Sequence, residues 1–209
     1  GSPGRMQMYV FTGPNPDIDG DFDAEIVIHE YCHGLSNRLV GGGSGISASQ
    51  TRAMGEGWSD FYGLALLSEP GDDIHANYAA GGYATRLFSS LTQNYYFGIR
   101  RYPYSTNLLI NPLTFKDIDP TQASAHTGIA RSPVIGNTAD EVHNAGEVWC
   151  AALWDMRANL ITRHGYATGN TLANRITGNS GKNTLSRGDG NDMLDGGAGA
   201  DTLDGGAGN

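Results

Sequence analysis

The stretch Ile26-Val27-Ile28-His29-Glu30-Tyr31-Cys32-His33-Gly34 decides how the rest of this chain is interpreted. It contains the pattern H-E-x-x-H. Four residues make about one helical turn, so His29 and His33 project from one face of a helix and can bind one metal ion. Glu30 follows the first histidine directly, which lets it reach a water molecule on that metal without being a ligand. The short pattern recurs by chance, so a third ligand is needed to make it specific.

The third ligand is predicted to be Glu56, in Gly55-Glu56-Gly57-Trp58-Ser59-Asp60, on a helix expected from about residue 49 to residue 67. Two histidines and a glutamate with an open fourth position form one of the known catalytic zinc sites. Asp60 lies four residues after Glu56 and shares its face. It is therefore placed to accept the other ring N–H of His29. The alternative is that Glu56 and Asp60 simply face solvent.

The H-E-x-x-H helix is expected from about Asp23 to Leu39, after a short strand over residues 6–11. The acids of Asp17-Ile18-Asp19-Gly20-Asp21-Phe22-Asp23 are similar to the start of an EF-hand loop. Ile28 stands at the twelfth position, where that loop needs Glu, so the EF-hand interpretation fails. Two alternatives stay open, a helix cap from Asp21 or Asp23 and a calcium site of another kind.

A third helix is expected from about Asp140 to Arg163, because apolar residues recur at helical spacing there. His143 lies in its first turn, near Asp140, where it suits a hydrogen-bond donor to a nearby anion. A weaker helical pattern covers residues 79–92, although Gly81 and Gly82 interrupt it.

The composition of this 209-residue chain argues against two kinds of partner, nucleic acid and the membrane interior. Its formal net charge is −9 and it has no cluster of Lys and Arg, so we expect no nucleic-acid partner. It has no apolar run of about 18 residues, so we expect no membrane insertion. Cys32 and Cys150 both fall in apolar helical patterns, which favours buried free thiols, with a disulfide between them as the alternative. The oligomeric state stays open.

The last thirty or so residues repeat with a period of nine, beginning at Gly178, Arg187 and Gly196. Leucines keep one phase, and Asn183, Asp192 and Asp201 share an earlier position in each copy. This pattern is typical of calcium-binding parallel β-rolls, and it predicts calcium ligands at these three residues. Residues 169–177 are either a linker or a degenerate first copy. The alternative for the whole segment is a flexible acidic linker.

The first two-thirds of the chain resembles the fungalysin family of secreted zinc metallopeptidases, which are thermolysin-like gluzincins. The similarity rests on several separate blocks, namely Arg5–Tyr9, Asp19–Asp23, His29–Arg38, Met54–Asp60, Tyr102–Asn107 and Val142–Trp149. The tail resembles the RTX repeats of bacterial exported proteins. Together these resemblances imply a secreted, bacterial protein with a partial, mainly helical α+β catalytic domain at residues 1–168 and an RTX β-roll at residues 178–209.

The resemblance implies that His29, His33 and Glu56 bind zinc, that Glu30 is the general base, and that Asp60 supports His29. His143 then resembles the histidine that hydrogen-bonds the tetrahedral oxyanion. The reaction implied is hydrolysis of peptide bonds by a zinc-activated water.

The chain also departs from the family pattern. Relatives carry a long β-rich segment before the zinc helix and more helices after the third one. The tyrosine that assists the oxyanion corresponds in position to Ser47, so that role is either empty or filled from elsewhere, with Tyr102 and Tyr104 as the candidates. The expected function is a secreted zinc endopeptidase acting on proteins or peptides. The alternative is a truncated zinc-binding remnant whose tail is a calcium-binding folding or secretion module.

Overall fold

The computed structural model describes residues 5–12, 16–88, 94–122, 126–133, 136, 138–165, 175–186 and 192–205. Its internal contacts divide the chain into two compact units, residues 1–158 and residues 159–209. None of the helices in the described ranges has the length and apolar character needed to cross a membrane. The two units are treated separately below.

The helix α1 (Ala24–Leu39) carries the H-E-x-x-H pattern. It follows the antiparallel pair β1 (Val10–Phe11) and β2 (Ile18–Asp19) and the 3₁₀ turn η1 (Gly20–Phe22). Asp23 caps α1, because its Oδ1 accepts the backbone N–H groups of Glu25 and Ile26. Its Oδ2 accepts the N–H of Ala84, so the capping carboxylate is fully engaged by protein donors. The structure thus favours the cap over the calcium site, and the first strand is shorter than predicted.

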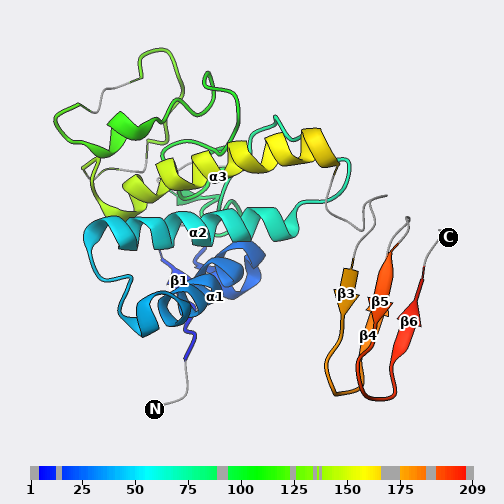
Figure 1. The fold of residues 1–209 in the computed structure, drawn as a ribbon. Coiled ribbons are helices and arrows are strands. Elements are labelled where there is room, and N and C mark those ends of the chain that lie inside the picture. The colour runs from blue at the N-terminus through cyan, green and yellow to red at the C-terminus, as the bar shows by residue number, and fades with distance from the viewer. Residues whose placement is uncertain are drawn as a thin grey trace. The chain divides into compact units, whose positions relative to one another are not determined.

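The helices α2 (Ser49–Leu67) and α3 (Val142–His164) cross at a pair of glycines. A Cβ atom on Gly57 would lie 2.5 Å from the carbonyl oxygen of Gly146, and one on Gly146 would lie 2.7 Å from Cβ of Glu56. Only glycine allows the two backbones to approach this closely. Figure 1 shows α2 between α1 and α3, so one helix supplies contacts to both neighbours. The crossing sets Glu56 directly beside the start of α3.

Between α2 and α3 the chain forms a long segment whose described residues are mostly irregular and include the 3₁₀ turn η4 (Phe115–Ile118). The predicted helix at residues 79–92 is wrong for its described part, because residues 81–87 form turns. Gly81 has a φ of +65°, which a right-handed helix does not allow. The segment packs into the core through Ala80 and Tyr104, which join Leu64 of α2 and Cys150 and Trp154 of α3. Cys32 and Cys150 are buried free thiols, so the disulfide alternative is not realised.

The described residues of the second unit contain four short strands in two parallel pairs. β3 (Arg175–Thr177) pairs with β5 (Met193–Asp195), and β4 (Thr184–Ser186) pairs with β6 (Thr202–Asp204). The partners Ile176 and Leu194, like Leu185 and Leu203, occupy one phase of the nine-residue repeat. Each strand therefore pairs with a strand two repeats away in the sequence, and not with the strand of the adjacent repeat. Leu203 is 48% exposed, so the last described strand does not bury its leucine as predicted.

Candidate active site

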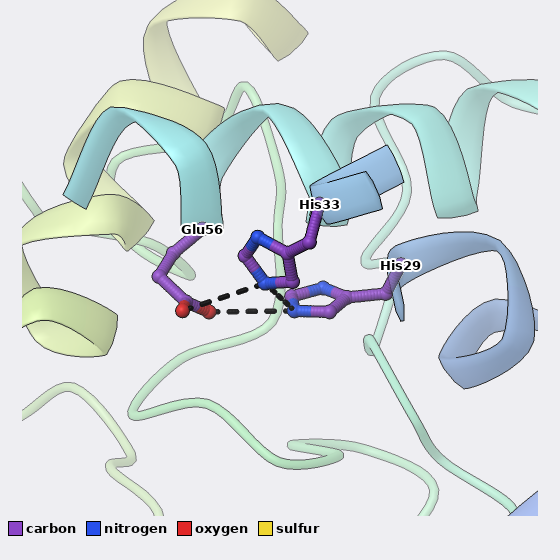
Figure 2. A group of neighbouring side chains, drawn as sticks. All are labelled: His29, His33 and Glu56. Carbon is purple, nitrogen blue, oxygen red and sulfur yellow. Dashed lines mark hydrogen bonds and ion pairs between the residues drawn. The ribbon is translucent and has the colours of Figure 1, made fainter. Parts of the chain in front are cut away.

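Three side chains meet between α1 and α2. Figure 2 shows His29 and His33 pointing from α1 toward Glu56 of α2. The two histidine Nε2 atoms are 3.0 Å apart, and Glu56 lies 3.3 Å from His29 through Oε2 and 3.4 Å from His33 through Oε1. Within the described ranges, this trio is the single group of three His, Cys, Asp or Glu residues whose ligand atoms come so close together. The predicted trio is therefore assembled in space.

The trio fits a zinc ion. Ligands held about 2.0–2.1 Å from a tetrahedral zinc lie about 3.3–3.4 Å from one another, close to the separations in this site. Glu56 Oε2 is buried, and its nearest donors among the described residues, His29 at 3.3 Å, His143 at 3.5 Å and Arg100 at 3.7 Å, are all farther away than a normal hydrogen bond. A buried carboxylate oxygen in this condition is costly unless a cation satisfies it. Nitrogen and carboxylate donors in this combination are suited to zinc.

Asp60 holds His29 as predicted. Its Oδ1 lies 2.8 Å from His29 Nδ1. The other ring nitrogen of His29, Nε2, therefore faces His33 and Glu56. Burial lowers the pKa of His29, but the hydrogen bonds to Asp60 and Glu56 outweigh it and raise that pKa to about 9. Without a metal the ring therefore carries a second proton at neutral pH. Metal binding must displace this proton.

Sequence reasoning missed two partners of Asp60 in the irregular segment. Arg100 donates from Nε to Oδ2 at 2.6 Å and from Nη2 to Oδ1 at 2.7 Å. The Tyr104 hydroxyl also donates to Oδ2. Burial alone would raise the pKa of Asp60, but the charge of Arg100 and these hydrogen bonds hold it well below its usual range. Asp60 is thus kept ionised and fixed in place by groups that no local motif marks.

The tyrosine proposed for the oxyanion is not supplied by this segment. Tyr104 is completely buried and uses its hydroxyl on Asp60. Tyr102 is 3% exposed and places its ring against that of His126. Both tyrosines are too buried for a substrate to reach, so neither fills the role, and the alternative that the role is empty stays open.

Glu30 lies on the open side of α1. It lines a groove of about 540 Å³ together with His33 and the first described residues of the chain. Those residues are Arg5, Met6 and Gln7. The groove places Glu30 beside the trio on a surface that solvent reaches. A carboxylate next to a metal position and open to a groove can take a proton from a water molecule there.

His143 stands at the start of α3, on the other side of Glu56. Its Nε2 is 3.5 Å from Glu56 Oε2, and its side chain is 52% exposed. Its Nδ1 lies 2.7 Å from Oε1 of Glu141, so Glu141 and not Asp140 orients the ring. With Nδ1 engaged by Glu141, Nε2 is the ring nitrogen that lies beside Glu56. The predicted oxyanion donor is therefore adjacent to the ligand trio.

The predicted calcium residues lie in the second unit. The backbone N–H of Asn183 donates to Asp201 Oδ1 at 2.9 Å, so these two positions face one another across the β4–β6 pair. Asp192 precedes β5, in the other pair of strands. The structure thus brings Asn183 and Asp201 together, and Asp192 lies next to a strand of the other pair.

Comparison with known proteins identifies the family. The profile described as Fungalysin metallopeptidase (M36) matches residues 1–193. Extracellular metalloproteinase mep of Aspergillus fumigatus is 42% identical over 168 residues, covering 79% of this chain and 22% of the relative. Extracellular metalloproteinase 5 of Arthroderma gypseum is 40% identical over 172 residues, covering 81% and 23%. The chain thus spans less than a quarter of the length of these relatives.

The relatives also correct one prediction. They are fungal proteins, and Extracellular metalloproteinase 1 of Trichophyton equinum adds a third fungal source at 39% identity over 81% of this chain and 24% of its own. The prediction of a bacterial source is therefore wrong. It rested on the glycine-rich tail alone, whose spacing reflects turn geometry and carries little information about the organism. The name "extracellular" in all three agrees with the predicted secretion. By its family match over residues 1–193, the chain belongs to the fungalysin metallopeptidase family.

Proposed function

We propose that this chain is the zinc-binding part of an extracellular metalloendopeptidase that hydrolyses peptide bonds in proteins or peptides. The observation that carries the proposal is the arrangement around Glu56. His29 and His33 approach its carboxylate from α1, and His143 approaches from α3. Glu30 lies beside His33 on an open groove. These are the groups that attack on a peptide carbonyl requires.

In this proposal His29, His33 and Glu56 hold the zinc, and Asp60 with Arg100 keeps His29 oriented. When bound, zinc lowers the pKa of a water molecule toward about 7 and polarises the substrate carbonyl. Glu30 accepts the proton of the attacking water and delivers it to the leaving nitrogen. His143 donates a hydrogen bond from Nε2 to the oxyanion that develops on the carbonyl oxygen when water adds to the carbon. Glu141 keeps the ring of His143 in the orientation that this donation needs.

The substrate is proposed to lie in the groove that Glu30 shares with residues 5–7. Met6 is 48% exposed and Tyr31 67% exposed, so the groove offers apolar surface to a peptide next to the general base. Backbone groups of an extended peptide and of residues 5–7 are able to pair as neighbouring strands do. This supports an endopeptidase, because such a groove grips a chain along its length.

For the second unit we propose calcium-binding repeats of the RTX kind, forming a short parallel β-roll over residues 178–209. The pairing of every second copy supports it, since this brings Asn183 and Asp201 to one edge. Carboxylate and carbonyl oxygens at a glycine-rich turn are the ligands that calcium prefers. Circular dichroism during a calcium titration, with magnesium as control, tests this. An unchanged spectrum counts against it.

A second candidate is a zinc-binding remnant with little catalysis. It is favoured by the apolar stripe that α1 exposes, with Tyr31 67%, Leu35 46% and Leu39 73% accessible. Surface of this kind is normally covered in a complete domain. The remnant would bind zinc but would not turn over peptides.

One comparison separates these candidates. Zinc content and hydrolysis of a fluorogenic peptide are measured for the wild type, for Glu30→Gln and for Glu69→Gln, an exposed glutamate outside the site. Loss of a general base is expected to lower kcat by about 10²–10⁴-fold while one zinc per chain is retained. Glu69→Gln should match the wild type. Zinc binding without any Glu30-dependent hydrolysis would favour the remnant.

A further inference from the structure

Arg100 and Arg101 are adjacent and buried, and they reach different helices. Arg100 is 4% exposed and binds Asp60 of α2, while Arg101 is 6% exposed and binds Glu147 of α3. Buried arginines are rare unless they are paired, so two in sequence mark a segment with a specific task. Only the first of them touches the proposed metal site.

Arg101 makes three contacts with the first two turns of α3. Its backbone N–H donates to Glu147 Oε1 at 2.8 Å, and its Nε donates to Glu147 Oε2 at 2.9 Å. Its Nη2 donates to the backbone carbonyl of Asn144 at 2.5 Å. Asn144 directly follows His143, so the last contact fixes the backbone one residue from the proposed oxyanion donor.

Other contacts make this end of α3 depend on Arg101. Asn144 and Glu147 are each 1% exposed, so their polar groups cannot turn to water. The side chain of Asn144 donates to the carbonyls of Gly136 and Thr138, which closes the loop before the helix. The imidazole of His143, by contrast, is half exposed, and within the described part of the chain its ring nitrogens contact Glu141 and Glu56. Its position therefore follows from that of the backbone.

We propose that Arg101 and Glu147 are positioning residues, which hold the first turn of α3 so that His143 faces the reacting carbonyl. With Arg100 fixed on Asp60, the two consecutive arginines set the distance between the metal-binding side and the oxyanion side of the site. This inference rests on the proposed function for its catalytic consequence. Its structural consequence, an ordered first turn of α3, does not depend on catalysis.

The test replaces the pair as a unit, because removing Arg101 alone leaves the Glu147 carboxylate buried and unpaired. A buried ion pair replaced by apolar residues of similar volume is often neutral in stability. The variant Arg101→Leu/Glu147→Leu is therefore expected to unfold within about 4 °C of the wild type. Arg101→Met/Glu147→Met serves as a second variant if the leucine pair does not fold, because it also removes both charges together and its flexible side chains adapt to the space.

In the double variant we expect kcat to fall about 10–100-fold, with KM and zinc affinity within about twofold of the wild type. A phosphonamidate peptide, which imitates the tetrahedral state, should bind more weakly by the same factor. Adding His143→Ala to the double variant should cause little further loss, because both changes remove one interaction. The control Arg157→Leu changes an arginine that joins the other half of α3 to Ser68. It should leave kcat and inhibitor affinity unchanged.

Hydrogen exchange gives a readout without substrate. The amides of Asn144, Ala145 and Gly146 should exchange at least about tenfold faster in the double variant, while those of α2 keep their rates. Unchanged exchange in the first turn of α3 overturns the proposal, and so do independent, multiplicative losses from His143→Ala and the double variant. A wild type without Glu30-dependent hydrolysis overturns the proposed function instead, and the exchange measurement still decides the role of Arg101.

Discussion

The two units of this chain hold their carboxylates in different ways. In the helical unit, Asp60 is engaged by a histidine, an arginine and a tyrosine that come from distant parts of the chain. In the repeat unit, Asp201 accepts the N–H of Asn183, and Asp195 accepts that of Gly197 two residues away. In the first arrangement, protein side chains alone supply the partners of the carboxylate. The second uses backbone N–H groups at or near glycine-rich turns, and the proposed calcium site rests on the carboxylates held there.

This difference predicts where stability comes from. Removing one partner from a buried ionic group leaves a charge without compensation, which costs much more than losing one hydrogen bond at a partly exposed turn. Changes around Asp60 should therefore be severe with or without metal ions. Changes in the repeats should be mild until calcium is added. The following measurements test this contrast, beginning with the largest expected effect.

Arg100→Met should be the most damaging change. It leaves the buried Asp60 carboxylate with His29 and Tyr104 alone, and we expect a loss of about 3–5 kcal/mol in the free energy of unfolding. Zinc affinity should also fall about 10–100-fold, because His29 loses its fixed orientation. Urea unfolding followed at 222 nm and zinc competition with a chromophoric chelator measure the two effects. Arg52→Met, on the exposed start of α2, is the control and should stay within about 0.5 kcal/mol of the wild type.

Asp23→Ala should come next. The change removes the cap of α1 and the acceptor for Ala84 together, at a residue that is 4% exposed. We expect a loss of about 2–4 kcal/mol, the sum of a cap and one buried hydrogen bond. Asp23→Asn keeps an acceptor of the same shape and should lose clearly less. Equal losses in the two variants would show that charge, and not hydrogen bonding, holds this junction.

Glu25→Gln should have an effect that depends on pH. Burial, partly offset by the N–H of Gly81, raises the pKa of Glu25 from 4.5 to about 7. Because the folded-state pKa is raised, the associated stability is fully present below about pH 4.5 and is lost as the pH rises through 7. Glutamine stays neutral and keeps the acceptor, so the variant should match the wild type at pH 4 and exceed it by about 1–3 kcal/mol at pH 8. Unfolding curves at both values decide this, and a variant that gains nothing at pH 8 contradicts the prediction.

Asp201→Ala should be the mildest change in the absence of calcium. It removes the acceptor of one hydrogen bond, from Asn183, at a partly buried site, which corresponds to about 0.5–1.5 kcal/mol. With calcium the wild-type tail should gain stability that the variant does not. Thermal scans in a calcium chelator and in millimolar calcium measure both. If Asp201→Ala in chelator lost as much free energy of unfolding as Arg100→Met, the predicted difference between the two units would be contradicted.

The helices were predictable from the sequence because their signals are local. The expected segments 23–39 and 49–67 agree with α1 and α2, and the third helix begins at Val142, two residues later than predicted. The cap at Asp23 and the i to i+4 spacing of the ligands are written in a few neighbouring residues. This shift at the third helix explains why Glu141, and not Asp140, orients His143.

The supporting side chains could not be predicted in the same way. Arg100, Arg101 and Tyr104 lie in an irregular segment, where no periodicity tells which helix each side chain will reach. The choice between Asp60 and Glu147 is made by long-range packing, including the close crossing at Gly57 and Gly146. In the tail the situation is reversed, because the residues that pair in the structure share one phase of the nine-residue period seen in the sequence. A periodic sequence indicates which residues lie side by side in the structure, whereas an irregular sequence does not.

The convergence on Asp60 has a consequence for the order in which the chain folds. Its partners lie 31, 40 and 44 residues away in sequence, so three large loops close before the carboxylate is satisfied. Closing such loops lowers the entropy of the chain before the stabilising contacts form. Helix α1, in contrast, is able to form early from local interactions. A newly made chain therefore presents His29 and His33 on a helix before His29 is locked. At the proposed zinc site, high-affinity binding would therefore begin only after the helical unit has folded.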